Sequence, residues 1–66
     1  MKDTNKKDII YNTLKIGTLF LNNEYASMFD YDDDNDDYFY YDVDSDSFIL
    51  VTVDEDGYIM GLDYNG

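Results

Sequence analysis

A chain of 66 residues is long enough for one domain. It has 16 acidic residues and four lysines, and its net charge of −12 favours positively charged partners. It lacks histidine and cysteine, which excludes disulfides, thiolate sites and the side chain that most often serves as general base and metal ligand. Folding buries only about 60% of the surface of so short a chain, so we expect its stability to be marginal.

The negative charge is concentrated in the C-terminal half. Residues 1–29 hold all four lysines and three acids, whereas residues 30–66 hold thirteen acids and no basic residue. Like charges at this density repel one another and attract positive surfaces. Direct binding to nucleic acid or anionic lipid is therefore not expected, and a basic protein surface is the expected partner.

Residues 5–15 are predicted to form a helix. Thr4 is a suitable N-cap, Ile10 and Leu14 lie four residues apart, and Gly17 can end the turn that follows. The apolar runs of this segment are short, and no secretory signal or membrane span is recognisable in it. We therefore expect a protein of the cytoplasm.

Residues 18–30 fit two structures. The run GTLFL favours a strand, whereas apolar residues at i, i+4, i+7 and i+8 favour a helix. We favour a second helix, which makes residues 1–29 mainly helical. The residues of its apolar stripe are Leu21, Tyr25, Met28 and Phe29.

Residues 30–37, DYDDDNDD, are expected to form an acidic loop. Runs of five or six like charges are usually disordered, and this alternative stays open for the loop by itself. It does not extend to the whole C-terminal half, because disordered acidic segments are poor in aromatic residues and residues 30–66 contain six tyrosines and two phenylalanines.

Residues 38–64 are predicted to form a three-stranded antiparallel β-meander. YFYYDVD alternates between two faces, FILVTV is rich in β-branched residues, and YIMGLDY returns as the third strand. Turns are expected at residues 44–47 and 54–57, where Gly57 can take the left-handed conformation. We expect no internal repeat and no domain linker.

The first of these strands has two unlike faces. Tyr38 and Tyr40 share one face with Asp42 and Asp44, and the other face carries Phe39, Tyr41 and Val43. We expect the two tyrosines to point outward beside the acids. A place in the core is an open alternative for Tyr41, and a weaker one for Tyr38 and Tyr40.

These elements predict an α+β fold, with an N-terminal helical segment packed on a three-stranded antiparallel β-meander. The chain forms a single small acidic domain over residues 1–66. It comprises a mainly helical segment at 1–29, an acidic loop at 30–37 and the β-meander at 38–64.

The aspartate run does not match a calcium-binding loop. An EF-hand loop beginning at Asp30 has Asn35 at the glycine position and Tyr41 at the position of the bidentate glutamate, and the register beginning at Asp32 also fails. No nucleophile has a base beside it, and a fold of this size can hardly form the dry pocket that paired catalytic carboxylates need. We expect no enzymatic activity, no cofactor and no dedicated metal site, while weak unspecific binding of divalent cations stays open.

A binding surface is the remaining function. Alternate residues of a strand lie about 6.8 Å apart on one face, which is close to the separation of phosphates along a DNA strand. Asp42 and Asp44 are thus expected to present carboxylates at phosphate-like intervals, with Tyr38 and Tyr40 as anchors for arginine-rich grooves. The predicted partner-binding residues are Asp32, Asp33, Asp34, Asp36, Asp37, Tyr38, Tyr40, Asp42, Asp44 and Asp46.

The runs DYDDDNDD and DVDSD, in a very short chain without histidine or cysteine, resemble those of small phage-encoded DNA-mimic proteins. That class includes anti-CRISPR proteins, anti-restriction proteins and uracil-DNA glycosylase inhibitors. The resemblance covers mainly residues 30–66, is compositional, and assigns no role to a particular residue. It implies a DNA-mimic inhibitor, foremost of the anti-CRISPR type, whose partner is the basic DNA-binding surface of a bacterial protein such as a CRISPR effector or a restriction enzyme. It also implies that the cytoplasm is that of a host bacterial cell.

Two other functions stay open on the same electrostatic grounds. One is an acidic immunity protein or antitoxin that neutralises a basic cognate protein. The other is a cation-binding or merely solubilising acidic domain. Dimerisation also stays open, although repulsion between two chains of this charge opposes it.

Overall fold

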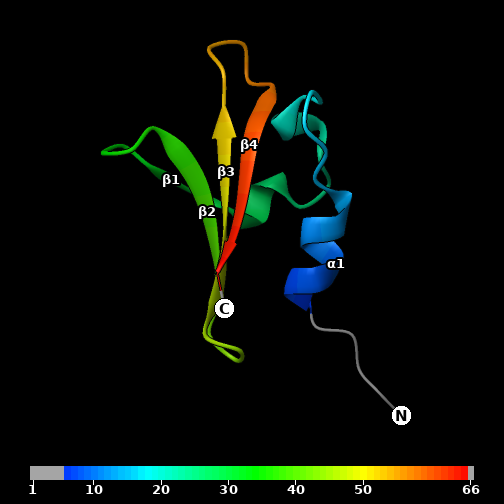
Figure 1. The fold of residues 1–66 in the computed structure, drawn as a ribbon, viewed down its shortest axis with the longest axis vertical. Coiled ribbons are helices and arrows are strands. Elements are labelled where there is room, and N and C mark those ends of the chain that lie inside the picture. The colour runs from blue at the N-terminus through cyan, green and yellow to red at the C-terminus, as the bar shows by residue number, and fades with distance from the viewer. Residues whose placement is uncertain (1–5, 66) are drawn as a thin grey trace.

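The computed structural model describes residues 6–65 and shows an α+β fold (Figure 1). One helix packs on a four-stranded antiparallel sheet in the order β1-β2-β3-β4. The predicted fold class is confirmed, with one strand more than expected. The elements are α1 (Lys6–Thr13), the 3₁₀ turns η1 (Phe20–Asn22) and η2 (Ala26–Met28), and the strands β1 (Asp30–Asp32), β2 (Asp37–Asp42), β3 (Ser47–Val53) and β4 (Ile59–Asn65).

Helix α1 ends earlier than predicted, at Thr13. The Thr13 hydroxyl donates a hydrogen bond of 2.7 Å to the carbonyl of Ile10, which occupies an acceptor of the last helical turn. Gly17 has the predicted left-handed conformation, with φ of 89°, in the turn that follows. The predicted N-cap, Thr4, lies outside the described residues.

The additional strand comes from the segment that we expected to be an acidic loop. In β1, Tyr31 pairs with Tyr38 of β2, and the flanking pairs are Asp30 with Phe39 and Asp32 with Asp37. Only three residues are paired, and two of them are aspartates, which are poor strand formers. The strand therefore has no pattern of its own and depends on the exposed edge of β2.

Residues 18–30 do not form the predicted second helix, and that prediction is wrong. The segment begins by pairing with the start of β4: the amide of Gly17 donates to the carbonyl of Ile59 at 2.8 Å, and the amide of Ile59 donates to the carbonyl of Thr18 at 2.8 Å. Two 3₁₀ turns follow. Asn23 fixes the loop between them through its side chain: Nδ2 donates to the Thr13 hydroxyl at 3.0 Å, and Oδ1 accepts from the backbone amide of Tyr25 at 2.8 Å.

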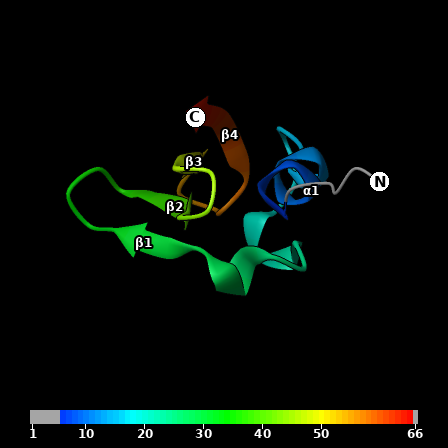
Figure 2. The same ribbon diagram turned by 90° about the horizontal axis from the view of Figure 1, so that it is seen from below.

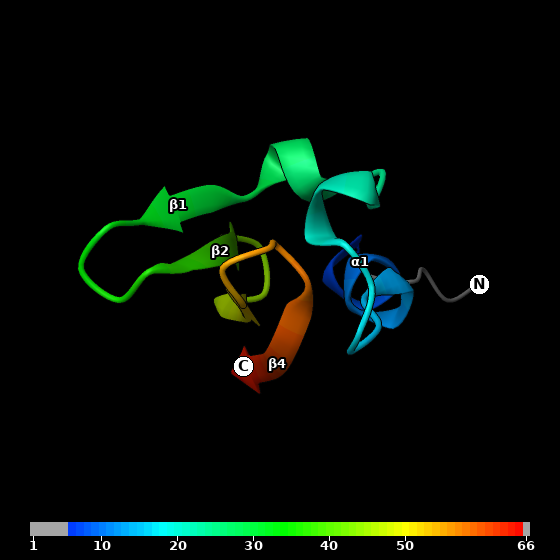
Figure 3. The same ribbon diagram turned by 90° about the horizontal axis from the view of Figure 1, so that it is seen from above.

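All of the helical segments lie on one side of the sheet (Figures 2 and 3). Phe20 of η1 sits at the centre of an aromatic chain on this side, with ring centroids 4.6 Å from Tyr38 and 5.3 Å from Phe29. Phe29 in turn lies 5.7 Å from Tyr40. The buried core consists of Ile10, Leu14, Phe20, Phe29, Ile49, Val51 and Ile59.

The two faces of β2 are the reverse of what the sequence suggested. Tyr38 pairs with Val51 and Tyr40 with Ile49, and both tyrosines pack half-buried against the core. The expectation that they point outward beside the acids is wrong. Tyr41, for which a place in the core was an open alternative, is half exposed on the opposite side.

Candidate partner-binding surface

The acidic residues are organised by two hairpins that repeat the same turn, contrary to the expectation of no repeat. In the first, YDDDND at 31–36, Oδ1 of Asp32 accepts the amide of Asp34 at 3.0 Å, and its Oδ2 accepts the side-chain amide of Asn35 at 2.9 Å. Asp36 has φ of 59°, a left-handed conformation that aspartate tolerates better than most residues. Its carboxylate accepts the hydroxyl of Tyr31.

The second hairpin, YDVDSD at 41–46, has the same contacts ten residues later. Oδ1 of Asp42 accepts the amide of Asp44 at 3.1 Å, and its Oδ2 accepts the Ser45 hydroxyl at 3.2 Å. Asp46 has φ of 55°, and it accepts the hydroxyl of Tyr41 at 2.6 Å. The repeat Y-D-x-D-[N/S]-D is therefore a turn motif, in which the aspartates at its second and sixth positions have structural roles.

The acids in the two turns raise the pKa of the tyrosines that bind them, Tyr31 and Tyr41. The hydrogen bond to Asp36, partial burial, and the negative charges of Asp36 and Asp33 raise the pKa of Tyr31 to about 12. The bond to Asp46, partial burial and nearby negative charge likewise raise the pKa of Tyr41. These phenols stay protonated and donate to carboxylates throughout the physiological pH range.

The turns at residues 33–36 and 54–57 lie at the same end of the sheet, because the strands of a meander reverse direction at each turn. Between them is an open groove with a volume of about 530 Å³. Tyr31 and Tyr38 line it with apolar Leu21 and Val53, and four acids surround them. These acids are Asp36, Asp54, Glu55 and Asp56.

The third turn uses the same chemistry as the other two in a shorter form. Oδ1 of Asp54 accepts the amides of Asp56 and Tyr58, each at 2.9 Å, and Gly57 takes the predicted left-handed conformation with φ of 91°. Asp54, Glu55 and Asp56 are not among the binding residues that we predicted from the sequence. The order of turns in a meander was the signal that would have grouped them with Asp36.

Asp42 and Asp44 do not form the predicted row of carboxylates on one strand. Asp42 is the last residue of β2 and lies on the core side, paired with Ser47, whereas Asp44 lies in the turn. The carboxylate of Asp42 accepts a hydrogen bond from the Ser45 hydroxyl. The geometric argument for phosphate-like spacing along β2 is therefore wrong.

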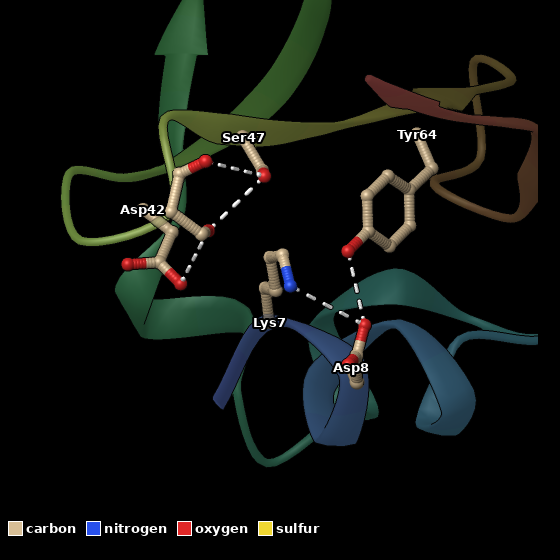
Figure 4. A network of polar contacts seen from close by, with 6 residues as sticks. Lys7, Asp8, Asp42, Ser47 and Tyr64 are labelled. Carbon is tan, nitrogen blue, oxygen red and sulfur yellow. Dashed lines mark hydrogen bonds and ion pairs between the residues drawn. The ribbon is translucent and has the colours of Figure 1, made fainter. Parts of the chain in front are cut away.

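Asp42 faces the one buried cation of the described chain, Lys7 (Figure 4). Lys7 is 7% exposed, and its Nζ lies 3.6 Å from Oδ1 of Asp8 and 5.7 Å from the ring centroid of Tyr64. The Tyr64 hydroxyl donates to the same Asp8 oxygen at 2.9 Å. The Tyr64 hydroxyl, then the charges of Asp8 and Asp42, raise the pKa of Lys7 against the opposing effect of burial. This network joins α1 to the ends of β2 and β4.

The predicted binding residues differ in their exposure. Asp33, Asp34, Asp36, Asp44 and Asp46 are exposed in the turns, while Asp32, Asp37, Asp42, Tyr38 and Tyr40 are partly buried. Oδ1 of Asp37 is buried and has no hydrogen-bond partner among the described residues. The ten residues are thus spread over both ends of the sheet and over its core face, and they do not form one continuous surface.

Within residues 6–65, no group of three or more acidic side chains is arranged to hold a metal ion, and no helix has the length and apolar character needed to cross a membrane. No protein-family model matches the chain, and neither a curated protein nor a solved structure matches it.

Proposed function

We propose that the protein is a non-catalytic inhibitor of the DNA-mimic type. It occupies the basic DNA-binding surface of a nucleic-acid-processing defence protein inside a bacterial cell, in the manner of anti-CRISPR or anti-restriction proteins. The observation that supports this proposal is uncompensated negative charge. The one ion pair of residues 6–65 is Lys7 with Asp8, Asp42 faces the same lysine, and the other described acids form no ion pair.

The density of this charge supports competition with DNA. A net charge of −12 along a long axis of 42 Å corresponds to one negative charge for about every 3.5 Å, close to the 3.4 Å spacing of a single DNA strand. Duplex DNA has twice that density. The protein therefore presents a DNA-like field at long range, which speeds association with a basic surface at low salt.

The test removes charge at positions that the fold does not use. Asp33, Asp34, Asp44 and Glu55 are exposed, and their side chains make no hydrogen bond within the described residues. The variant D33N/D34N/D44N/E55Q should fold normally and lose most of its affinity for the protein that the wild type captures from a bacterial lysate at low salt. The control is K6A/K15A, which removes two exposed cations and should bind at least as well.

Duplex DNA provides the second arm of this test. A captured target that is first saturated with DNA should no longer bind the protein, and association should slow steeply as salt increases. Binding that persists on DNA-loaded target, or a quadruple variant that binds as well as the wild type, contradicts DNA mimicry.

The groove between the turns at 33–36 and 54–57 favours a second candidate, an immunity-like or antitoxin-like protein. A DNA-binding groove needs a convex ligand, whereas this acidic end is concave and has aromatic walls. Such a groove suits a projecting lysine or arginine of a basic cognate protein, held by carboxylates and tyrosine faces. A captured small basic protein that binds equally well in the presence of DNA would support this candidate over the first.

A further inference from the structure

The sheet face opposite α1 is apolar at its centre. Phe39 pairs with Leu50 and Tyr41 pairs with Phe48, so these four side chains form two neighbouring rows on that face. None of them belongs to the core cluster or to the side chains packed on it. Tyr41 is half exposed and the other three are partly buried, and the helical segments all lie on the opposite side of the sheet (Figures 2 and 3). We call this surface, defined by these four residues, the open sheet face.

An apolar centre is unusual for the solvent side of such a sheet. Antiparallel sheets that pack one face on a core normally carry polar residues on the other. Here β3 alternates Ile49 and Val51 toward the core with Phe48 and Leu50 toward the opposite face. Both faces of the sheet are therefore apolar enough to pack against another element. Within residues 6–65, only the face on the side of α1 is packed in this way.

Acids surround the open sheet face, so a partner that binds there should be positively charged. Asp30 pairs with Phe39 at one side, and Asp63 pairs with Leu50 at the other. The adjacent row holds Asp32 and Asp37, and residues 30–66 contain no basic residue. A second copy of the chain would bring these acids together, and an anionic membrane would be repelled in the same way.

We propose that the open sheet face binds an amphipathic helix of a partner protein, whose apolar stripe is flanked by lysine or arginine. Phe39 and Tyr41 are separated by about 6.8 Å along β2, and the paired row on β3 lies about 4.8 Å away. This area suits the i, i+3 and i+4 side chains of one helix, about 10 Å in diameter. On the opposite face, Ile10 of α1 and Leu14, the residue after the helix, are already buried in the core. This inference rests on the proposed function only in that both require a positively charged partner.

The experiment uses the full chain and two synthetic peptides of about 18 residues. One places leucines at i, i+3 and i+4 positions with lysines elsewhere, and the other has the same composition in an order without an apolar face. In NMR spectra recorded at physiological salt, the amphipathic peptide should shift the amide resonances of Phe39, Tyr41, Phe48 and Leu50. It should bind at least about tenfold more tightly than the scrambled peptide, because only it buries the apolar centre.

Matched variants separate the open sheet face from general electrostatics. F48T/L50T keeps β-forming residues and should weaken the amphipathic peptide about tenfold or more without affecting the scrambled one. I16T removes an apolar side chain that is 58% exposed in the turn after α1, and it should change neither affinity. L50T alone serves if the double variant loses its dispersed spectrum. The variant D33N/D34N/D44N/E55Q should weaken both peptides to the same extent, so the proposed function and this inference fail separately.

Two results overturn the inference. Equal affinity for the two peptides, with shifts confined to residues 33–36 and 54–57, means that charge alone directs binding. A dimer that forms with rising concentration and is abolished by F48T/L50T means that the face is covered by a second copy.

Discussion

Phe20 and Leu21 are neighbours in η1 with opposite environments, and they distinguish this structure from the helix that the sequence favoured. Phe20 is 1% exposed and contacts the rings of Phe29 and Tyr38, whereas Leu21 is 69% exposed. A helix over residues 18–30 would instead bury Leu21 in its apolar stripe. Truncation of each side chain therefore measures which structure the segment has in solution.

The expected costs differ severalfold. Phe20→Leu keeps an apolar side chain but removes two aromatic contacts of about 0.5–1.5 kcal/mol each, so the free energy of unfolding should fall by about 1–3 kcal/mol. Phe20→Ala should cost about 3–5 kcal/mol. A domain of this length is stable by about 3–10 kcal/mol, so Phe20→Ala should be partly or wholly unfolded. Leu21→Ala should stay within about 0.5 kcal/mol of the wild type.

Urea unfolding followed by far-UV circular dichroism measures these differences, provided that the m-value is unchanged among the variants. The comparison of Phe20→Leu with Leu21→Ala is internally controlled, since both positions lie in one turn. Equal losses, or a larger loss for Leu21→Ala, would refute the placement of Phe20 in the core and favour the helix.

Three further predictions concern pH, backbone conformation and salt. Because the folded pKa of Tyr31 is raised from 10.0 to about 12, its contribution to stability is present below pH 10 and is lost as the pH rises toward 12; Tyr31→Phe should flatten this alkaline loss in urea titrations. Gly57→Ala should cost about 1–2 kcal/mol in thermal unfolding, because φ is 91°, whereas Gly61→Ala, whose Cβ would meet Thr52 at an ordinary 3.7 Å, should cost less. The melting temperature should rise from low to moderate salt, because screening relieves repulsion among acids that lack cations; a fall would contradict this.

The β-meander was predictable because local signals agree over residues 38–64. Alternation in β2, β-branched residues in β3 and Gly57 in the last turn all favour the same structure. β1 was not predictable, because three residues with two aspartates carry no strand pattern and pair only after β2 exists. The same reason explains residues 18–30, where pairing of Thr18 with Ile59 replaces the local helical preference.

Which face of β2 is buried could not be predicted from the sequence, for a different reason. β3 is apolar on both sides, with Ile49 and Val51 on one and Phe48 and Leu50 on the other. Alternation in β2 then offers two equivalent solutions, since either set of its aromatic side chains finds apolar neighbours across the strand pair. Packing of α1 and Phe20 decides between them, and these contacts are set by tertiary structure.

The turn motif gives several aspartates of the acidic run a structural role. Asp32 and Asp42 accept backbone amides at the start of their turns, and Asp36 and Asp46 take left-handed conformations and bind tyrosine hydroxyls. Half of the eight predicted binding acids therefore have a reason to be present in a hairpin without any partner. Their abundance by itself is weak support for molecular recognition.

Several other acids have no structural role in the turns and support recognition of a partner more strongly. Asp33, Asp34, Asp44 and Glu55 are exposed, and none of their side chains makes a hydrogen bond within residues 6–65. Turn positions of this kind accept asparagine, serine, lysine or glycine as readily as aspartate, and neutral residues there would reduce the repulsion that destabilises the chain. Retaining charge at such positions opposes stability, so its benefit has to lie outside the fold, in solubility or in a basic partner. The quadruple variant separates these two: a gain in stability accompanied by a loss of capture identifies the partner, whereas aggregation with capture unchanged identifies solubility.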